Sequence, residues 1–130
     1  LLTLSRRTPS AALAPLRAAA GDNGLVWDGT GPNPYPAILG IADAIIVTAD
    51  SASMAADAIS TGTPVYIHPL QGGTVKFQHF HKQLVADGHT RPCTVPLTPY
   101  TPVRLDESQV VAQALIARLP RCAGPHRPPV

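Results

Sequence analysis

The stretch that decides the fold is DAIIVTADSASMAADAISTGTPVYIHP, residues 43–69. It reads as an apolar strand, a sharp polar turn, a short helix of small residues that Gly62 ends, and a second apolar strand. A strand, helix and strand in so short a segment predict a right-handed crossover between parallel strands. The first strand, AIIVTA, is apolar nearly throughout, which predicts a strand covered on both faces. We therefore expect an α/β fold built on a parallel sheet with helices on both faces.

The polar turn TADSAS, between that strand and helix, is the best functional candidate. In a crossover of this kind the turn lies at the carboxyl edge of the sheet, where open α/β folds bind their ligands. Asp50, Ser51 and Ser53 offer capping oxygens to the free amides of the helix. Asp57 can share a helix face with Ser53 because the spacing between them is i to i+4. The turn therefore predicts a ligand site, to which we also assign Met54.

A second interpretation of the turn makes Ser51 or Ser53 a nucleophile. A serine at a strand-to-helix turn is typical of a hydrolase elbow, and His68 ends the next strand, from where it could approach Ser51. The glycines of the G-x-S-x-G motif are missing, so helix capping is the more ordinary role for these serines. Cys93 is a weaker nucleophile candidate still.

The loop SRRT near the start of the chain is a second candidate site. It lies between an apolar strand and an Ala-rich helix, whose free amides and dipole favour anions. An anionic ligand would therefore be held by the helix and by Arg6 and Arg7 together, with Ser5 and Thr8 beside them. The alternative, that the two arginines are solvated or pair with acidic residues, is equally open.

The residues after this loop give conflicting indications of where the next helix begins. Thr8 before Pro9 is a good helix start, because Thr caps free amides and Pro suits the first helical position. Pro15 falls inside the helix and removes a backbone donor, so we expect a kink or a late start. Gly21 can end the helix in a left-handed turn.

A turn rich in Gly, Pro and Asn follows the second predicted strand, GLVWD. Asn33 before Pro34 indicates a turn or a helix cap. Tyr35 would then lie at a helix start near the same sheet edge, where it could cover a ring or a sugar. The more ordinary alternative is a tyrosine packed on a neighbouring loop.

The segment KFQHFHKQLVADG predicts a further helix. Its apolar face is formed by Phe77, Phe80, Leu84 and Val85. The loop LQGGTV before it has two adjacent glycines and either approaches a ligand or merely turns the chain. His79 and His81 alternate, so a helix points them apart and we expect no metal site here.

The rest of the chain predicts a crossing segment, one helix and a tail. HTRPCTVPLTPYTPVRL is Pro-rich and extended. The last helix starts at Asp106, whose spacing to Gln109 resembles a capping box. Its apolar residues are Val110, Ala114, Leu115 and Leu119. Residues 120–130 should form a disordered tail.

Composition narrows the class of protein. The 130 residues, 45% of them apolar, suffice for one domain with a core. A net charge of +2 without a block of like charge does not indicate a nucleic-acid partner. No apolar run is long enough for a membrane span. Cys93 and Cys122 show neither a disulfide framework nor a metal spacing, which favours a cytoplasmic setting. The opening LLTL, without Met, suggests a fragment that lacks a partner domain.

Five motifs occur in the order SRRTP, NPY, VTADSASM with TGTPVYI, KFQHFHKQL and HTRP. In this order the chain resembles the mitochondrial fission protein family of the elongated-mitochondria type, over most of residues 3–92. That family includes many uncharacterised bacterial members and is similar in its carboxyl half to GT-B nucleotide-sugar enzymes. The resemblance implies the Rossmann-like carboxyl-terminal half of a GT-B-like fold over residues 1–119, with the amino-terminal domain missing.

The similarity to GT-B enzymes implies a half that binds a nucleoside diphosphate or a nucleotide-sugar. Asp57 matches the acidic residue that binds ribose hydroxyls in such enzymes. That residue is usually a Glu, whose carboxylate reaches about one methylene further than the carboxylate of Asp57. Ser51 and Ser53 match the small polar residues that approach the diphosphate, and SRRT matches a loop where phosphate contacts are expected. The implied activity is that of a glycosyltransferase or epimerase without a metal or other cofactor, since amides and arginines can offset the phosphate charge.

The plant members of the family imply a different role, recruitment of a dynamin-like fission protein to the mitochondrial surface. The chain would then be a non-catalytic interaction module that acts through a protein partner at the periphery of a membrane. Fold alone does not choose between the two roles. In a GT-B enzyme the acceptor site, and often the catalytic base, come from the amino-terminal half. The catalytic residues therefore stay unassigned, and we expect the isolated chain to be inactive.

Overall fold

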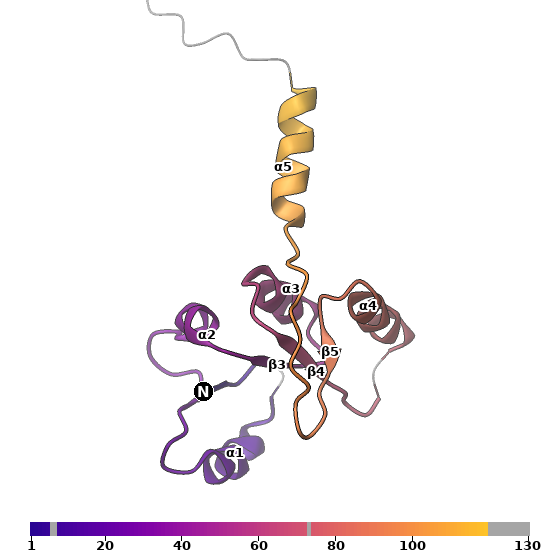
Figure 1. Cartoon of the computed structure of the whole chain (residues 1–130). Coiled ribbons are helices and arrows are strands. Elements are labelled where there is room, and N and C mark those ends of the chain that lie inside the picture. The colour runs from indigo at the N-terminus through magenta and orange to yellow at the C-terminus, as the bar shows by residue number, and fades with distance from the viewer. Residues whose placement is uncertain (6–7, 73, 120–130) are drawn as a thin grey trace, which may run out of the picture.

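The computed structural model of the chain describes residues 1–5, 8–72 and 74–119. The predicted tail at 120–130 lies outside these residues. Strands and helices alternate along the described chain (Figure 1). The strands are β1 (Leu2–Thr3), β2 (Val26–Trp27), β3 (Ile45–Thr48), β4 (Val65–His68) and β5 (Arg91–Pro92). The helices are the 3₁₀ turn η1 (Ser10–Ala12), α1 (Leu13–Ala20), α2 (Tyr35–Ile41), α3 (Ala52–Ser60), α4 (Val75–Ala86) and α5 (Glu107–Arg118).

Every strand pairing among the described residues is parallel. β4 lies between β3 and β5 in a three-stranded sheet, and β1 pairs with β2 in a separate two-stranded sheet. Because α3 joins β3 to its parallel neighbour β4, residues 43–69 form the strand–helix–strand unit that the sequence predicts. The predicted α/β fold with parallel strands is therefore confirmed.

The core lies between β3 and β4 on one side and α3 and α4 on the other. Its buried members are Val47, Ala55, Ala58, Ile59, Val65, Ile67 and Leu84. The two alanines have no exposed surface, so the backbone of α3 lies close against the strands. Leu84 supplies the contribution of α4. The small residues that the sequence places in the central helix thus serve tight packing on the sheet.

The opposite face of β4 is covered by the crossing segment at 93–106. The rings of Tyr66 and Tyr100 meet edge to face with their centroids 5.7 Å apart. The Tyr66 hydroxyl donates to the carbonyl of Thr98 at 3.0 Å. The Tyr100 hydroxyl accepts from the amide of Val65 at 2.9 Å and lies 2.9 Å and 3.1 Å from the carbonyls of Val65 and His89. The segment is therefore fixed to β4 by both packing and hydrogen bonds.

One prediction about β3 is wrong. The apolar run AIIVTA predicts a strand covered on both faces, but Ile46 is 56% exposed while its neighbour Val47 is 5% exposed. Ile46 is the register partner of Tyr66, so it lies on the face that the crossing segment covers over β4. The crossing segment leaves Ile46 open. Apolar sequence alone therefore overstates how completely the sheet is covered.

Some of the predicted helix starts and caps are present in the structure, and others are not. α1 starts late, at Leu13 after η1, as Pro15 predicts, and Gly21 follows its last residue with a φ of 62°. Thr8 does not cap this helix, because its hydroxyl accepts the backbone amide of Ser5 instead. The prediction of a capping box at Asp106 is also wrong, since the side chain of Asp106 makes no capping hydrogen bond to α5.

α5 projects away from the sheet (Figure 1). None of its residues is buried, and the apolar residues predicted for it are exposed, as Val110 at 65% and Leu115 at 54% show. No helix in the described part of the chain has the length and apolar character that crossing a membrane requires.

Removal of the Tyr100 hydroxyl should destabilise the fold. We expect Tyr100→Phe to lower the free energy of unfolding by about 1–3 kcal/mol, because the amide of Val65 loses its acceptor in a poorly solvated place. Tyr66→Phe is the matched control and should cost less, since it removes a single bond to the Thr98 carbonyl. Urea denaturation measures both. Equal stabilities of Tyr100→Phe and the unchanged protein would contradict this account of the crossing segment.

Candidate functional site

Ser51 is the cap of α3. The residue is 8% exposed, and its Oγ accepts the amide of Met54 at 3.4 Å. Its own amide donates to the carbonyl of Thr48 at 3.2 Å, which closes the turn after β3. The hydroxyl thus has the ordinary capping role, and no contact described for it joins it to His68. The turn lies at the carboxyl end of β3, as the sequence predicts.

Two predicted site residues, one on α2 and one on α3, are in contact although 22 positions separate them in the sequence. The Tyr35 hydroxyl donates to Oδ2 of Asp57 at 3.4 Å. Asn33 orients this tyrosine, because its Oδ1 accepts the amide of Tyr35 at 3.0 Å at the start of α2. Asp57 is exposed and Tyr35 is half-buried, so a ligand can reach both side chains.

The ionisation of Tyr35 reflects this environment. Burial, followed by the negative charge of Asp57 and the hydrogen bond to it, raises the pKa of Tyr35 to about 12. The phenol therefore stays protonated at neutral pH and remains a donor to the carboxylate. Asp57 in turn presents an acceptor to solvent on the outer side of α3.

The neighbouring residues of α3 differ in exposure. Ser53 is exposed in the first turn of the helix. Met54 is half-buried and packs against the core, so its side chain serves the fold. The structure therefore brings Ser53 and Asp57 to the surface of one helix and directs Met54 toward the sheet.

The SRRT loop is described only at its ends. The amide of Ser5 donates to the hydroxyl of Thr8 at 3.1 Å, and the amide of Thr8 donates to the carbonyl of Ser5 at 3.0 Å. These two bonds join Ser5 to Thr8 after β1. Arg6 and Arg7 lie outside the described residues.

A cavity of about 720 Å³ opens on the other side of the turn. Ala49 and Asp50 contribute from the end of β3, and the loop that follows β4 contributes Pro69, Leu70, Gln71 and Gly72. α4 forms the opposite wall with Phe77, Gln78, His81, Lys82 and Val85. The sequence left open whether the LQGGTV loop approaches a ligand, and it did not predict that α4 lies opposite this loop across a cavity. The signals that could have found it are the two adjacent glycines after β4 and the polar residues of KFQHFHKQL.

His81 fixes this wall to the sheet. The residue is 9% exposed, and its Nε2 lies 2.8 Å from the carbonyl of Ala49. Because a carbonyl only accepts, Nε2 carries the hydrogen, and the neutral ring then has Nδ1 as an acceptor. Nδ1 is buried, and the described residues offer it no hydrogen-bond partner. The rings of Phe77 and Phe80 pack against the imidazole.

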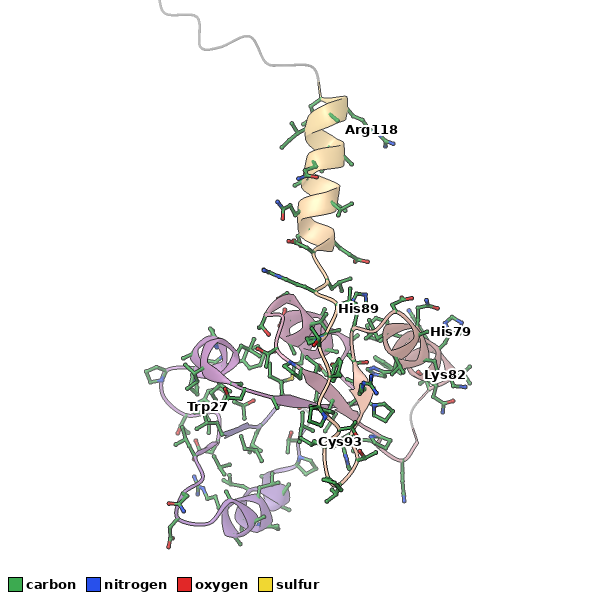
Figure 2. All side chains as sticks on the ribbon, viewed as in Figure 1. Trp27, His79, Lys82, His89, Cys93 and Arg118 are labelled. Atoms are coloured by element: carbon green, nitrogen blue, oxygen red, sulfur yellow. The ribbon has the colours of Figure 1, made fainter. Side chains whose placement is uncertain are left out.

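The two histidines of α4 have different surroundings, as the sequence predicts. His79 is exposed, whereas His81 is buried. Figure 2 shows His79 and Lys82 on α4, at the side of the molecule away from Trp27. Among the described residues, no three side chains of His, Cys, Asp or Glu are grouped so that they could hold a metal ion.

Comparisons with known proteins agree with the resemblance found in the motifs. The family model described as mitochondrial fission ELM1 matches residues 1–119. The chain is 40% identical over 95 residues to the mitochondrial fission protein ELM1 of Arabidopsis thaliana, an alignment that covers 72% of this chain and 22% of the plant protein. It is 31% identical over 122 residues to the uncharacterized protein RP120 of Rickettsia prowazekii (strain Madrid E), covering 88% of this chain and 34% of that protein.

No solved structure matches the chain. The chain spans 22% and 34% of the lengths of the two curated relatives, so their alignments concern a part of each. The family match nevertheless extends from Leu1 to Leu119 and includes β1 through α5. The chain therefore belongs to the mitochondrial fission ELM1 family.

Proposed function

We propose that the chain is the part of a GT-B-like glycosyltransferase or epimerase that binds the nucleoside diphosphate of a nucleotide-sugar. The observation that carries this proposal is the contact between Tyr35 and Asp57 on the helix that Ser51 caps. An accessible carboxylate can accept hydrogen bonds from the hydroxyls of a ribose. A half-buried tyrosine next to it offers a flat surface for a ring.

The start of α3 supports a diphosphate on the same helix. The first amides of a helix have no partners within the helix, and together with the helix dipole they favour an anion. Ser51 uses one of these amides through its bond to Met54. Ser53 is exposed in the same turn and can donate its hydroxyl to a phosphate oxygen. Arg6 and Arg7 would add positive charge, and this contribution remains a prediction.

The transfer step would need groups from elsewhere in the parent protein. In this proposal the chain holds the nucleotide, and oriented amides and arginines offset the charge of the leaving phosphate without a metal. The acceptor and the catalytic base would belong to a preceding domain. The isolated chain would then bind nucleotides without catalysing transfer.

A second candidate function is a non-catalytic interaction module with a protein partner. The observation in its favour is α5, which carries several large apolar residues and buries none of them. The plant relative is named a mitochondrial fission protein, and such a role could depend on a partner. Under this alternative, changes to Val110 or Leu115 would abolish function while Asp57 would be dispensable.

Calorimetric titration with UDP and with GDP tests the nucleotide proposal. We expect Asp57→Asn to weaken the binding of the preferred nucleotide about tenfold, because an amide accepts ribose hydroxyls less well than a carboxylate. Asp43→Asn is the matched control, since Asp43 is also exposed but precedes β3 at the opposite edge of the sheet. The proposal fails if neither nucleotide binds at millimolar concentration, or if both variants weaken binding equally.

The contact between Tyr35 and Asp57 can be tested by titrating the Tyr35 hydroxyl. Tyr35 should ionise near pH 12, and Asp57→Asn should lower this pKa only in part, because burial is the largest cause of the shift. Since the folded-state pKa lies above the ordinary 10.0, the contact contributes to stability below pH 10 and loses that contribution as the pH rises toward 12. NMR of the tyrosine ring carbons measures the pKa. An unchanged value in Asp57→Asn would show that the two side chains do not interact.

A further inference from the structure

A smaller cavity, of about 230 Å³, lies where α3, α4 and the start of α5 come together. Ala56 and Ile59 contribute from α3, and Glu107 contributes from α5. Figure 2 labels His89, another lining residue, between α3 and α4. None of the residues that line this cavity lines the larger one. Because its volume is below the usual range of small-molecule sites, it suits a ligand group about as large as one side chain.

His89 presents a hydrogen-bond acceptor to this cavity. The residue is 9% exposed, and its Nδ1 lies 2.7 Å from the carbonyl of Val103. Because a carbonyl only accepts, Nδ1 carries the hydrogen, and the neutral ring then has Nε2 as an acceptor. No hydrogen bond among the described residues involves Nε2. A ligand that reaches this nitrogen must therefore bring a donor.

The other polar side chains of the cavity also offer acceptors. The two carboxylate oxygens of Asp87 accept from Nε2 of Gln83 at 2.9 Å and 3.0 Å. This pairing occupies the donors of Gln83 and leaves its carbonyl oxygen as an acceptor. Glu107 adds a second carboxylate, which is exposed. Among the described residues that line the cavity there is no Lys or Arg, so these negative charges select a cation.

The remaining walls are apolar. Ile59 and Leu84 are buried, and Phe80 and Leu105 are half-buried beside them. A metal ion gains nothing from such walls, and the described residues hold no group of three His, Cys, Asp or Glu side chains that could bind one. A primary ammonium has three donors and no acceptor, and a methylene stem behind it can lie against apolar side chains. An alkylammonium therefore matches both the polar atoms and the walls.

We propose that this cavity binds a primary alkylammonium group, the chemistry that a lysine side chain shares with a free aliphatic amine. The ammonium would donate to Nε2 of His89 and to the carboxylates of Asp87 and Glu107, and its stem would lie against Phe80. The cavity shares no residue with the candidate nucleotide site, so it would be a second binding site on the chain.

The test is an NMR titration of the isotope-labelled chain with n-butylammonium at low salt. It is run at about pH 8, where an ordinary imidazole is neutral and a primary amine is protonated. We expect the Nε2 signal of His89 to shift as this nitrogen accepts a hydrogen bond. Uncharged 1-butanol, which has the same stem, should bind about tenfold more weakly, because hydrogen bonds from a charged donor are the stronger ones.

A pair of neighbouring acidic residues supplies the matched variants. Glu107→Gln should weaken the binding of butylammonium about threefold, a modest effect because this carboxylate is exposed. Asp106→Asn is the control, since Asp106 is also exposed but does not line the cavity, and it should leave the affinity unchanged.

Two further ligands distinguish the sources of the ammonium. Tighter binding of a lysine blocked at both its amino and carboxyl ends would identify a lysine of a partner protein, and tighter binding of putrescine would identify a free amine. The proposal is overturned if the Nε2 signal of His89 does not move, if 1-butanol binds as tightly as butylammonium, or if Glu107→Gln and Asp106→Asn weaken binding equally.

Discussion

The close packing of α3 on β3 and β4 is the constraint on which the rest of the structure depends. Ala55 and Ala58 have no exposed surface, so nothing larger fits between this helix and the strands without moving them. The contact fixes where α3 begins, and hence where the turn that Ser51 caps lies at the carboxyl end of β3. The position of the candidate site therefore follows from side-chain size in the core.

Two surfaces meet at this turn, and they differ in chemistry. On one side Tyr35 donates to the exposed Asp57 of α3. On the other side α4 closes a mostly apolar cavity, held in place by the bond between His81 and the carbonyl of Ala49.

The sequence predicts local features well and long-range ones less well. The crossover, the Ser51 cap and the late start of α1 follow from strand, cap and proline patterns in adjacent residues. The cavity was not predicted, because its walls come from segments that only the fold brings together. The exposure of Ile46 was missed because apolar character does not specify which segment covers a side chain. The bond between Thr8 and Ser5 was missed because the capping potential of a threonine does not specify which amide its hydroxyl accepts.

The central claim is that the turn at the start of α3 receives an anionic nucleotide. The most direct measurement is an NMR titration of the isotope-labelled chain with UDP or GDP, followed through its backbone amides. The account predicts the largest shifts at Ser51, Ser53 and Asp57, with smaller shifts at Tyr35. Saturating nucleotide that leaves these amides unchanged, or that shifts only residues of α5, would contradict it.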